Sequence, residues 1–316
     1  MKILTYDEVD HDQVFKLHLS AFGYPLTEER VRIKVERDFR VSKHFGFYAV
    51  KGEKVVGQVI AMKIPTRTRE GVEKVLGVAE VAVVADERRK GIASELMWRV
   101  EEMAVEEGMR FSWLITAAHL VAHGMYNKLG YYEMISFIRG FHKIPKKQVK
   151  PKGIKFRNYR KSDSETLAGL HKDYLKGSLG FTERQHDLLE LLLALKVLSK
   201  NDIRVAMNGG EVVGYTVFQK RQGIPSFMEV VARKASDFNS IVRTIESDHK
   251  GSLASASSLV QKRQRDRFVR LGYQTDPASW YVLMAKPLVK GISKIELEKM
   301  YGFDDGSFTF MSLDGF

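Results

Sequence analysis

One stretch of the sequence, residues 77–98, places a β-branched run, a basic turn and a helical pattern in direct succession. The β-branched run favours a strand over residues 75–84, and the apolar spacing of a helix begins at Ile92. Amides at the start of a helix attract anions, because they lack acceptors within the helix and the helix dipole adds to the attraction. The stretch therefore predicts a strand, an anion-binding loop and a helix over residues 91–107.

The composition of this loop favours a phosphorylated ligand. Three cationic side chains lie at 88–90, and small residues follow at Gly91 and Ala93, where backbone amides can approach a ligand closely. The loop lacks the second glycine and the Gly-Lys-Ser/Thr ending of a nucleotide-hydrolase loop, and it lacks the glycine triplet of a dinucleotide-binding fold. The sequence thus excludes both of those classes of phosphate loop.

With Arg88, Gly91 and Ala93, the loop resembles the Arg/Gln-x-x-Gly-x-Gly/Ala motif that binds acyl-coenzyme A in the GNAT acetyltransferase superfamily. Two further features agree with the resemblance. Glu80 lies in the preceding strand, and residues 126–131, Tyr-Asn-Lys-Leu-Gly-Tyr, are similar to the motif that closes the family's domain.

The resemblance implies acetyl-coenzyme A as the co-substrate and assigns residues to it. The main chains of Val81 and Val83 are expected to bind the pantetheine arm and the acetyl carbonyl, on a strand that separates from its neighbour. The loop is expected to bind the pyrophosphate through Arg88, Arg89, Lys90, Gly91, Ile92 and Ala93. The alternative is a solvated basic turn that precedes a helix.

Acetyl transfer to an amine needs a group that accepts a proton and a group that supplies one. Tyr126 is the candidate acid, because the reference pKa of a phenol, about 10, is close to the value of about 8.5 for a thiol. Its alternative is a core aromatic. Glu80 is the candidate base, although a strand glutamate can also face solvent or pair with a cation. The terminal carboxylate of Phe316 and a water molecule remain rival bases.

Two histidines, His119 and His123, have the spacing of neighbours on one face of a helix expected at 119–129. This spacing is compatible with a metal, but the sequence around them offers no third ligand, so we expect no metal site. His119 occupies the place where the family commonly has an asparagine that contacts coenzyme A, so that contact is not expected here.

The chain has 316 residues, of which 44% are apolar, and no cysteine. This length favours two domains. The absence of cysteine excludes disulfides, thiolate metal sites and a cysteine nucleophile. No secretion signal or membrane-spanning run is apparent, so we expect a soluble cytoplasmic protein that does not bind membranes.

The net charge of +12 has one concentrated source, the acid-free basic stretch from Lys143 to Lys161. Pro145 and Pro151 lie within it, so it is interpreted first as a linker between domains, at about 143–153. A nucleic-acid partner is disfavoured, because only Phe156 and Tyr159 accompany the basic residues.

The second half of the chain repeats features of the first. Residues 208–215 echo residues 51–58, and residues 268–273 echo residues 126–131. We therefore expect an α+β protein with mixed central sheets flanked by helices, in two tandem GNAT-like domains at 1–145 and 154–316. The second copy is degenerate, because its loop region lacks glycine, holds Asp237, and has Phe268 in place of the tyrosine. A C-terminal extension should add a helix at 292–300 and a strand at 306–311.

These observations favour an acetyl-coenzyme A dependent N-acetyltransferase that acts by direct attack of a primary amine on the thioester. The acceptor stays open between small molecules, such as polyamines and aminoglycosides, and peptide or protein amines. The alternative is a binding protein without catalysis, either a coenzyme A sensor or a basic nucleic-acid-associated module. The sequence does not indicate an oligomeric state.

Overall fold

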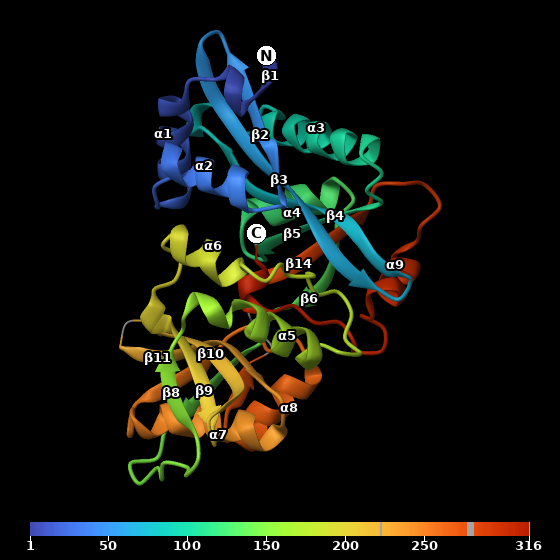
Figure 1. Ribbon diagram of the computed structural model, residues 1–316. Helices are drawn as coiled ribbons and strands as arrows, with labels where there is room; N and C mark the ends of the chain where they lie inside the picture. The colour runs from blue at the N-terminus through green and yellow to red at the C-terminus, as the bar shows by residue number, and fades with distance from the viewer. Residues whose placement is uncertain (222, 277–280, 316) are drawn as a thin grey trace. The chain divides into compact units, whose positions relative to one another are not determined.

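The computed structural model describes residues 1–221, 223–276 and 281–315 (Figure 1). The chain divides into two compact units. The first unit contains residues 1–135 and 281–300, and the second contains residues 301–315 and the described part of 136–279. Each unit has a seven-stranded sheet, and helices lie on both faces of each sheet, so the expected α+β class is confirmed.

The first sheet has the strand order β1-β2-β3-β4-β5-β14-β6. Strands β1 to β4 are antiparallel neighbours, β4 and β5 are parallel, and β5 and β14 are antiparallel. Its strands are β1 (Lys2–Thr5), β2 (Val41–Lys51), β3 (Lys54–Thr68), β4 (Gly71–Val83), β5 (Phe111–Ala117), β6 (Tyr132–Ser136) and β14 (Tyr281–Pro287). Its helices are α1 (His11–Phe22), α2 (Glu28–Arg37), α3 (Ile92–Glu106), α4 (Val121–Lys128) and α9 (Lys294–Tyr301), with short 3₁₀ turns at Tyr6–Glu8 and Ala85–Glu87.

Alternation along β3 divides the apolar side chains of the first unit between two cores. Val59 and Ala61 face α3 and α4, whereas Ile60 and Met62 face α1 and α2. The helices are delimited by local signals: the Asp10 side chain accepts a hydrogen bond from an amide in the first turn of α1, and that helix ends at a left-handed glycine. A period of two in the strands therefore gives each sheet face its own core.

The second sheet has the order β13-β7-β12-β11-β10-β9-β8. Its strands are β7 (Arg139–Lys143), β8 (Lys155–Asn158), β9 (Ile203–Asn208), β10 (Glu211–Arg221), β11 (Ile224–Ala232), β12 (Leu253–Ala256) and β13 (Gln274–Asp276). Its helices are α5 (Ser164–Tyr174), α6 (Leu188–Ala194), α7 (Ala235–Ser247) and α8 (Lys262–Arg270), with 3₁₀ turns at Lys161–Asp163, Lys200–Asp202 and Ser312–Asp314. One core lies under α7 and α8, and the other lies under α5 and α6.

The two units differ from the expected segments 1–145 and 154–316, because one strand of each sheet comes from the other half of the chain. β7 follows the first half but pairs with β12 and β13 in the second sheet. β14 follows the second half but pairs with all seven residues of β5 in the first sheet. The chain therefore enters each unit twice.

A part-buried polar cluster holds β14 in the first unit. The ammonium group of Lys286, on β14, donates to the carboxylate of Glu101 on α3 at 2.6 Å. The hydroxyl of the buried Tyr131 donates to the same carboxylate at 3.0 Å and lies 2.6 Å from the hydroxyl of Ser112. This cluster joins β14 to α3 and β5, which are distant from it in the sequence.

Other expectations about the second half are partly corrected. The stretch 143–161 is not only a linker, because it includes the end of β7 and the whole of β8. The expected C-terminal helix is present as α9. The expected strand at 306–311 is not formed, because this segment makes only an isolated parallel bridge between Phe308 and Leu179. Within the described ranges, no helix is both long enough and apolar enough to cross a bilayer.

Candidate active site

The loop between β4 and α3 has two residues in the left-handed backbone region, Arg89 at φ +62° and Gly91 at φ +82°. Gly91 is the N-cap of α3, and no side chain caps this helix end. A Cβ at Gly91 would meet no atom within 4 Å, so the glycine is required by the backbone conformation and not by lack of space. The first amides of α3, which lack helical acceptors, are available to a ligand.

The cationic side chains of this loop are exposed and differ in their contacts. Arg88 Nε donates to the carbonyl of Val83 at 3.1 Å. Lys90 lies 3.3 Å from the carboxylate of Glu87, which also accepts from Lys51 at 2.5 Å. The hydrogen bond from Lys51 is the main cause that lowers the pKa of Glu87. These contacts connect the end of β4 to the loop. The basic residues of the loop still outnumber its acidic ones.

The sheet opens next to this loop. The parallel ladder between β4 and β5, two strands that are described in full, joins only Leu76–Val78 to Ser112–Leu114. On the other edge of β4, the register with β3 shifts between Gln58 and Ile60, and Glu80 has a φ of +52°. A bulge of this kind bends a strand and interrupts its pairing. Val81 and Val83 therefore lie on the part of β4 that has left β5.

Glu80 is surrounded by polar side chains from the helical segment before β2. Its carboxylate lies 3.5 Å from Nδ1 of His18 and 3.5 Å from Nζ of Lys34, and it accepts a hydrogen bond from the hydroxyl of Tyr24 at 3.3 Å. Gln58 Nε2 donates to the backbone carbonyl of Glu80 at 3.2 Å. The Glu80 side chain is 14% exposed, so a ligand can still reach it.

Burial sets the protonation of the groups around Glu80. Desolvation is the main cause that lowers the pKa of His18, a fully buried residue of α1, so the imidazole is neutral at pH 7. Desolvation, followed by the charge of Glu80, raises the pKa of Tyr24 to about 12. Sequence reasoning missed His18, Tyr24 and Lys34, because α1 and α2 show only amphipathic patterns, and no local motif relates them to a strand some fifty residues later.

Tyr126 lies on α4 and is buried in the core under α3 and α4. Its ring packs edge-on against Tyr131, with ring centroids 5.9 Å apart. Burial raises the pKa of Tyr126 to about 12. The side chains of Val81, Val83 and Ile92 belong to or pack against the same core. The structure thus brings the loop, the open part of β4 and Tyr126 together, whereas the side chain of Glu80 contacts α1 and α2.

The two histidines do not share a helix face as expected. His119 precedes α4, and only His123 lies within it. Nε2 of His123 lies 2.6 Å from the carboxylate of Glu133. Across the described part of the chain, no three potential ligands are grouped as a metal ion would require. The terminal carboxylate of Phe316, the rival base, lies outside the described residues.

The corresponding region of the second unit is built differently. Glu229 on β11 is buried and makes a two-point pair with Arg184 at 2.7–2.8 Å, and Asp314 accepts from Nε of the same arginine at 2.5 Å. Phe268 is fully buried and has no hydroxyl. α7 begins after Lys234 without a left-handed glycine. This copy therefore lacks the backbone turn and the phenol of the first.

Comparison with known proteins agrees with this geometry. Residues 2–134 match the family model of the acetyltransferase (GNAT) domain. No curated protein matches the sequence. A solved structure of a probable N-acyltransferase of unknown function from Enterococcus faecalis is similar to 94% of this chain, over 73% of its own length, with 15% identity and a TM-score of 0.69.

Two further solved structures are similar over both units. A GCN5-related N-acetyltransferase from Anabaena variabilis has 13% identity and a TM-score of 0.70, with 91% of this chain and 73% of that chain covered. Eis1 from Mycobacterium abscessus has 14% identity and a TM-score of 0.61, with 91% and 74% covered. At these identities the likeness establishes the tandem fold. Together with the family match, it shows that residues 2–134 have the fold of a GNAT acetyltransferase domain.

Proposed function

We propose that this protein transfers an acetyl group from acetyl-coenzyme A to a primary amine of a small molecule or peptide. The observation that supports the proposal most directly is the N-terminus of α3. It has the left-handed Gly91 as its N-cap, without a side-chain cap, and it is reached by the loop that follows the open end of β4. Free amides, a helix dipole and exposed cations at one place suit a pyrophosphate.

The same residues fit the rest of the co-substrate. Val81 and Val83 lie on a strand edge that β5 does not pair, so their main-chain groups can bind the amide-bearing pantetheine arm. Residues Arg88 to Ala93 then bind the phosphates through Arg88, Arg89, Lys90 and the amides of Gly91, Ile92 and Ala93. Acetyl-coenzyme A supplies the acyl group as a thioester.

Two side chains are proposed for the proton transfers. Glu80 accepts the proton that the amine loses as its nitrogen bonds to the acyl carbon, either directly or through a water molecule. Tyr126 gives its phenolic proton to the thiolate that leaves. Lys34 lies 3.5 Å from the Glu80 carboxylate and pairs with it. The neutral His18 adds no positive charge that would repel an amine.

A binding protein without catalysis is the alternative, and one observation favours it. Burial raises the pKa of Tyr126 to about 12, above that of a thiol, so proton donation from the free enzyme is unfavourable. In this alternative the loop binds coenzyme A but releases no thiol.

A thiol-release assay with acetyl-coenzyme A across polyamines, aminoglycosides and peptide amines discriminates between the two. Catalysis predicts release that depends on the amine and falls in Glu80→Gln. Binding of acetyl-coenzyme A without release toward any amine would support the sensor instead. A nucleic-acid-associated role would show affinity for nucleic acid that falls steeply with salt.

A further inference from the structure

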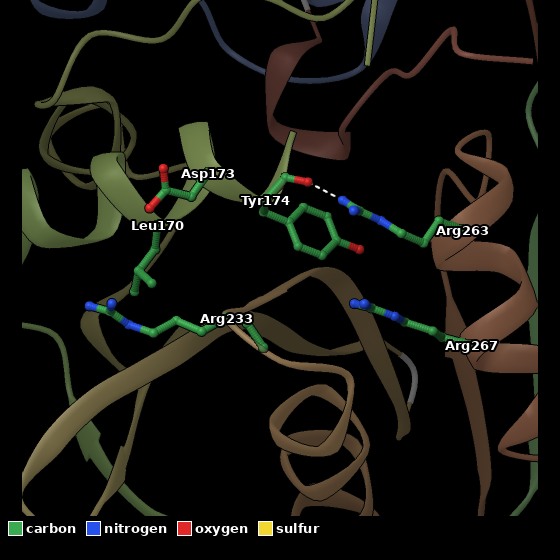
Figure 2. Close-up of a pocket in the computed structure, with 7 residues that line it drawn as sticks. Leu170, Asp173, Tyr174, Arg233, Arg263 and Arg267 are labelled. Carbon is green, nitrogen blue, oxygen red and sulfur yellow. Dashed lines mark hydrogen bonds between the residues drawn. The ribbon is translucent and has the colours of Figure 1, made fainter. Parts of the chain in front are cut away.

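The second unit contains a small pocket of about 80 Å³ between α5, the end of β11 and α8. Figure 2 shows the residues that line it. Three of them are arginines, Arg233, Arg263 and Arg267, and the one acidic residue is Asp173. The volume suits a group of a few heavy atoms and is too small for a whole coenzyme.

Two of the arginines, Arg263 and Arg267, lie one helical turn apart on α8 and extend toward the ring of Tyr174 (Figure 2). The guanidinium carbons lie 4.9 Å and 5.8 Å from the centre of that ring. Arg263 also donates to the backbone carbonyl of Tyr174. In the same view the carboxylate of Asp173 points away from both guanidinium groups. The contacts with Tyr174 therefore place the two positively charged guanidinium groups close together.

The two arginines of α8 have no carboxylate paired with them in the described part of the chain. Among the described residues, neither Arg263 nor Arg267 forms an ion pair, and Nη1 of Arg267 is buried without a hydrogen-bond partner. The hydroxyl of Tyr174, whose side chain is buried, makes no hydrogen bond of good geometry and has the Arg267 guanidinium as its polar neighbour. Buried donors of this kind are costly unless an acceptor satisfies them. Burial raises the pKa of Tyr174 to about 12, so its hydroxyl stays protonated and can donate.

The pocket lies at the place in the second unit that corresponds to the loop region of the first. β11 pairs in parallel with β12 only at Ser226 and Phe227, and Arg233 follows the end of β11. When the two closing motifs are aligned on Tyr126 and Phe268, the two α8 arginines correspond to Val121 and Met125 of α4, which are apolar. The arginines are thus specific to the second copy.

We propose that this pocket, formed by Arg263, Arg267 and the hydroxyl of Tyr174, binds the phosphate group of a small anionic ligand. Two guanidinium groups and a hydroxyl supply donors from two directions, which suits a tetrahedral oxyanion with several acceptor oxygens. A carboxylate is planar and has fewer oxygens, so it should bind more weakly. The second copy has thus lost the glycine loop and gained a separate anion site.

Calorimetric titration of the full-length protein with inorganic phosphate tests the proposal. Arg263→Gln and Arg267→Gln should each weaken binding by about tenfold or more, because each removes a charged hydrogen-bond donor. Arg270→Gln, on the same helix but outside the pocket, is the control for net charge and should not change the affinity. Gly108→Val should not change it either, because that residue lies in the first unit and outside the loop at residues 88–93.

Arg267 packs against Phe238 and Tyr174, so thermal unfolding of Arg267→Gln must be compared with the parent. Arg263 is exposed, and its variant keeps the test valid if Arg267→Gln does not fold. Titration with acetate should give weaker binding than phosphate. Unchanged phosphate affinity in both arginine variants, or acetate binding as tightly as phosphate, would overturn the proposal.

Discussion

Nδ1 of the buried His18 lies 3.5 Å from the carboxylate of Glu80, at the bulge where β4 turns away from β5. The two residues are 62 positions apart in the sequence, and the bulge directs the carboxylate toward α1 and α2. Glu80 is thus held by helices on one face of the sheet, while the loop and Tyr126 lie with the core on the other face.

This arrangement predicts separate effects for Glu80 and for its neighbours. Glu80→Gln should lower the rate of amine acetylation by about 10²-fold with little change in acetyl-coenzyme A affinity, since it removes a base without altering the loop. Lys34→Met should lower the rate less, because it removes an ion pair that holds the carboxylate in place without removing the carboxylate itself. An unchanged rate in Glu80→Gln would separate Glu80 from the chemistry.

Tyr126→Phe should lower turnover by about 10²-fold while the ring continues to fill the core. Stability should change little, as judged by urea unfolding, and Kd for acetyl-coenzyme A should stay the same. Phe268→Ala, at the corresponding position of the second unit, should reduce stability by about 3–5 kcal/mol through a cavity without affecting the chemistry directly. If Tyr126→Phe keeps full turnover, Tyr126 is a core residue only.

A chain truncated after Lys147 should not fold stably, because it lacks β14. That strand pairs with every residue of β5, and its Lys286 neutralises Glu101 inside the first unit.

In the full chain, Lys286→Met should destabilise the protein by about 3 kcal/mol, since it leaves a part-buried carboxylate without its cation. Glu101→Gln combined with Lys286→Met should recover part of this loss. A truncated chain with a cooperative thermal transition at the parent Tm would contradict this prediction.

Stability should also fall as pH is lowered. Burial is the main cause that lowers the pKa of His171 to about 3, compared with about 6.5 in an unfolded chain. The unfolded state therefore binds the proton more readily, and stability present above pH 6.5 is lost as pH falls toward 3. Between pH 7 and pH 5 this residue should cost about 2 kcal/mol. The difference in urea midpoint between those pH values should shrink in His171→Gln, and an equal difference in both proteins would rule out this assignment.

Local patterns in the sequence predict the parts of the fold whose signals are local. The strand, loop and helix at 77–98 are present as β4, the turn at Gly91 and α3, because β-branched runs, glycine and helical spacing act within a few residues. The exchange of β7 and β14 between the sheets could not be predicted, since pairing partners of strands are set by long-range packing. The alternating stretch 306–311 predicts a strand, but in the structure its backbone pairs with Leu179 alone, through an isolated bridge at Phe308.

The candidate site also contains residues that the sequence predicts and residues that it does not. The loop can be recognised in the sequence, because Arg88, Gly91 and Ala93 match a motif and the left-handed backbone at Gly91 requires a glycine. The partners of Glu80 come from α1, α2 and the segment between them, and nothing in a single sequence relates Tyr24 or Lys34 to that strand. The arginines of α8 look like ordinary surface charges in the sequence, and only their placement around Tyr174 distinguishes them.

Calorimetric titration of acetyl-coenzyme A into the parent protein, Gly91→Val and Gly108→Val tests the central claim most directly. Gly91 is the N-cap of α3, and Gly108 lies just after the end of the same helix. Their φ values are +82° and +79°, and a Cβ at either position would meet no atom within 4 Å. The backbone strain added by valine should therefore be similar at both, about 1–3 kcal/mol. We expect binding to be lost in Gly91→Val and kept in Gly108→Val; equal affinity in all three proteins would contradict the placement of the co-substrate at this loop.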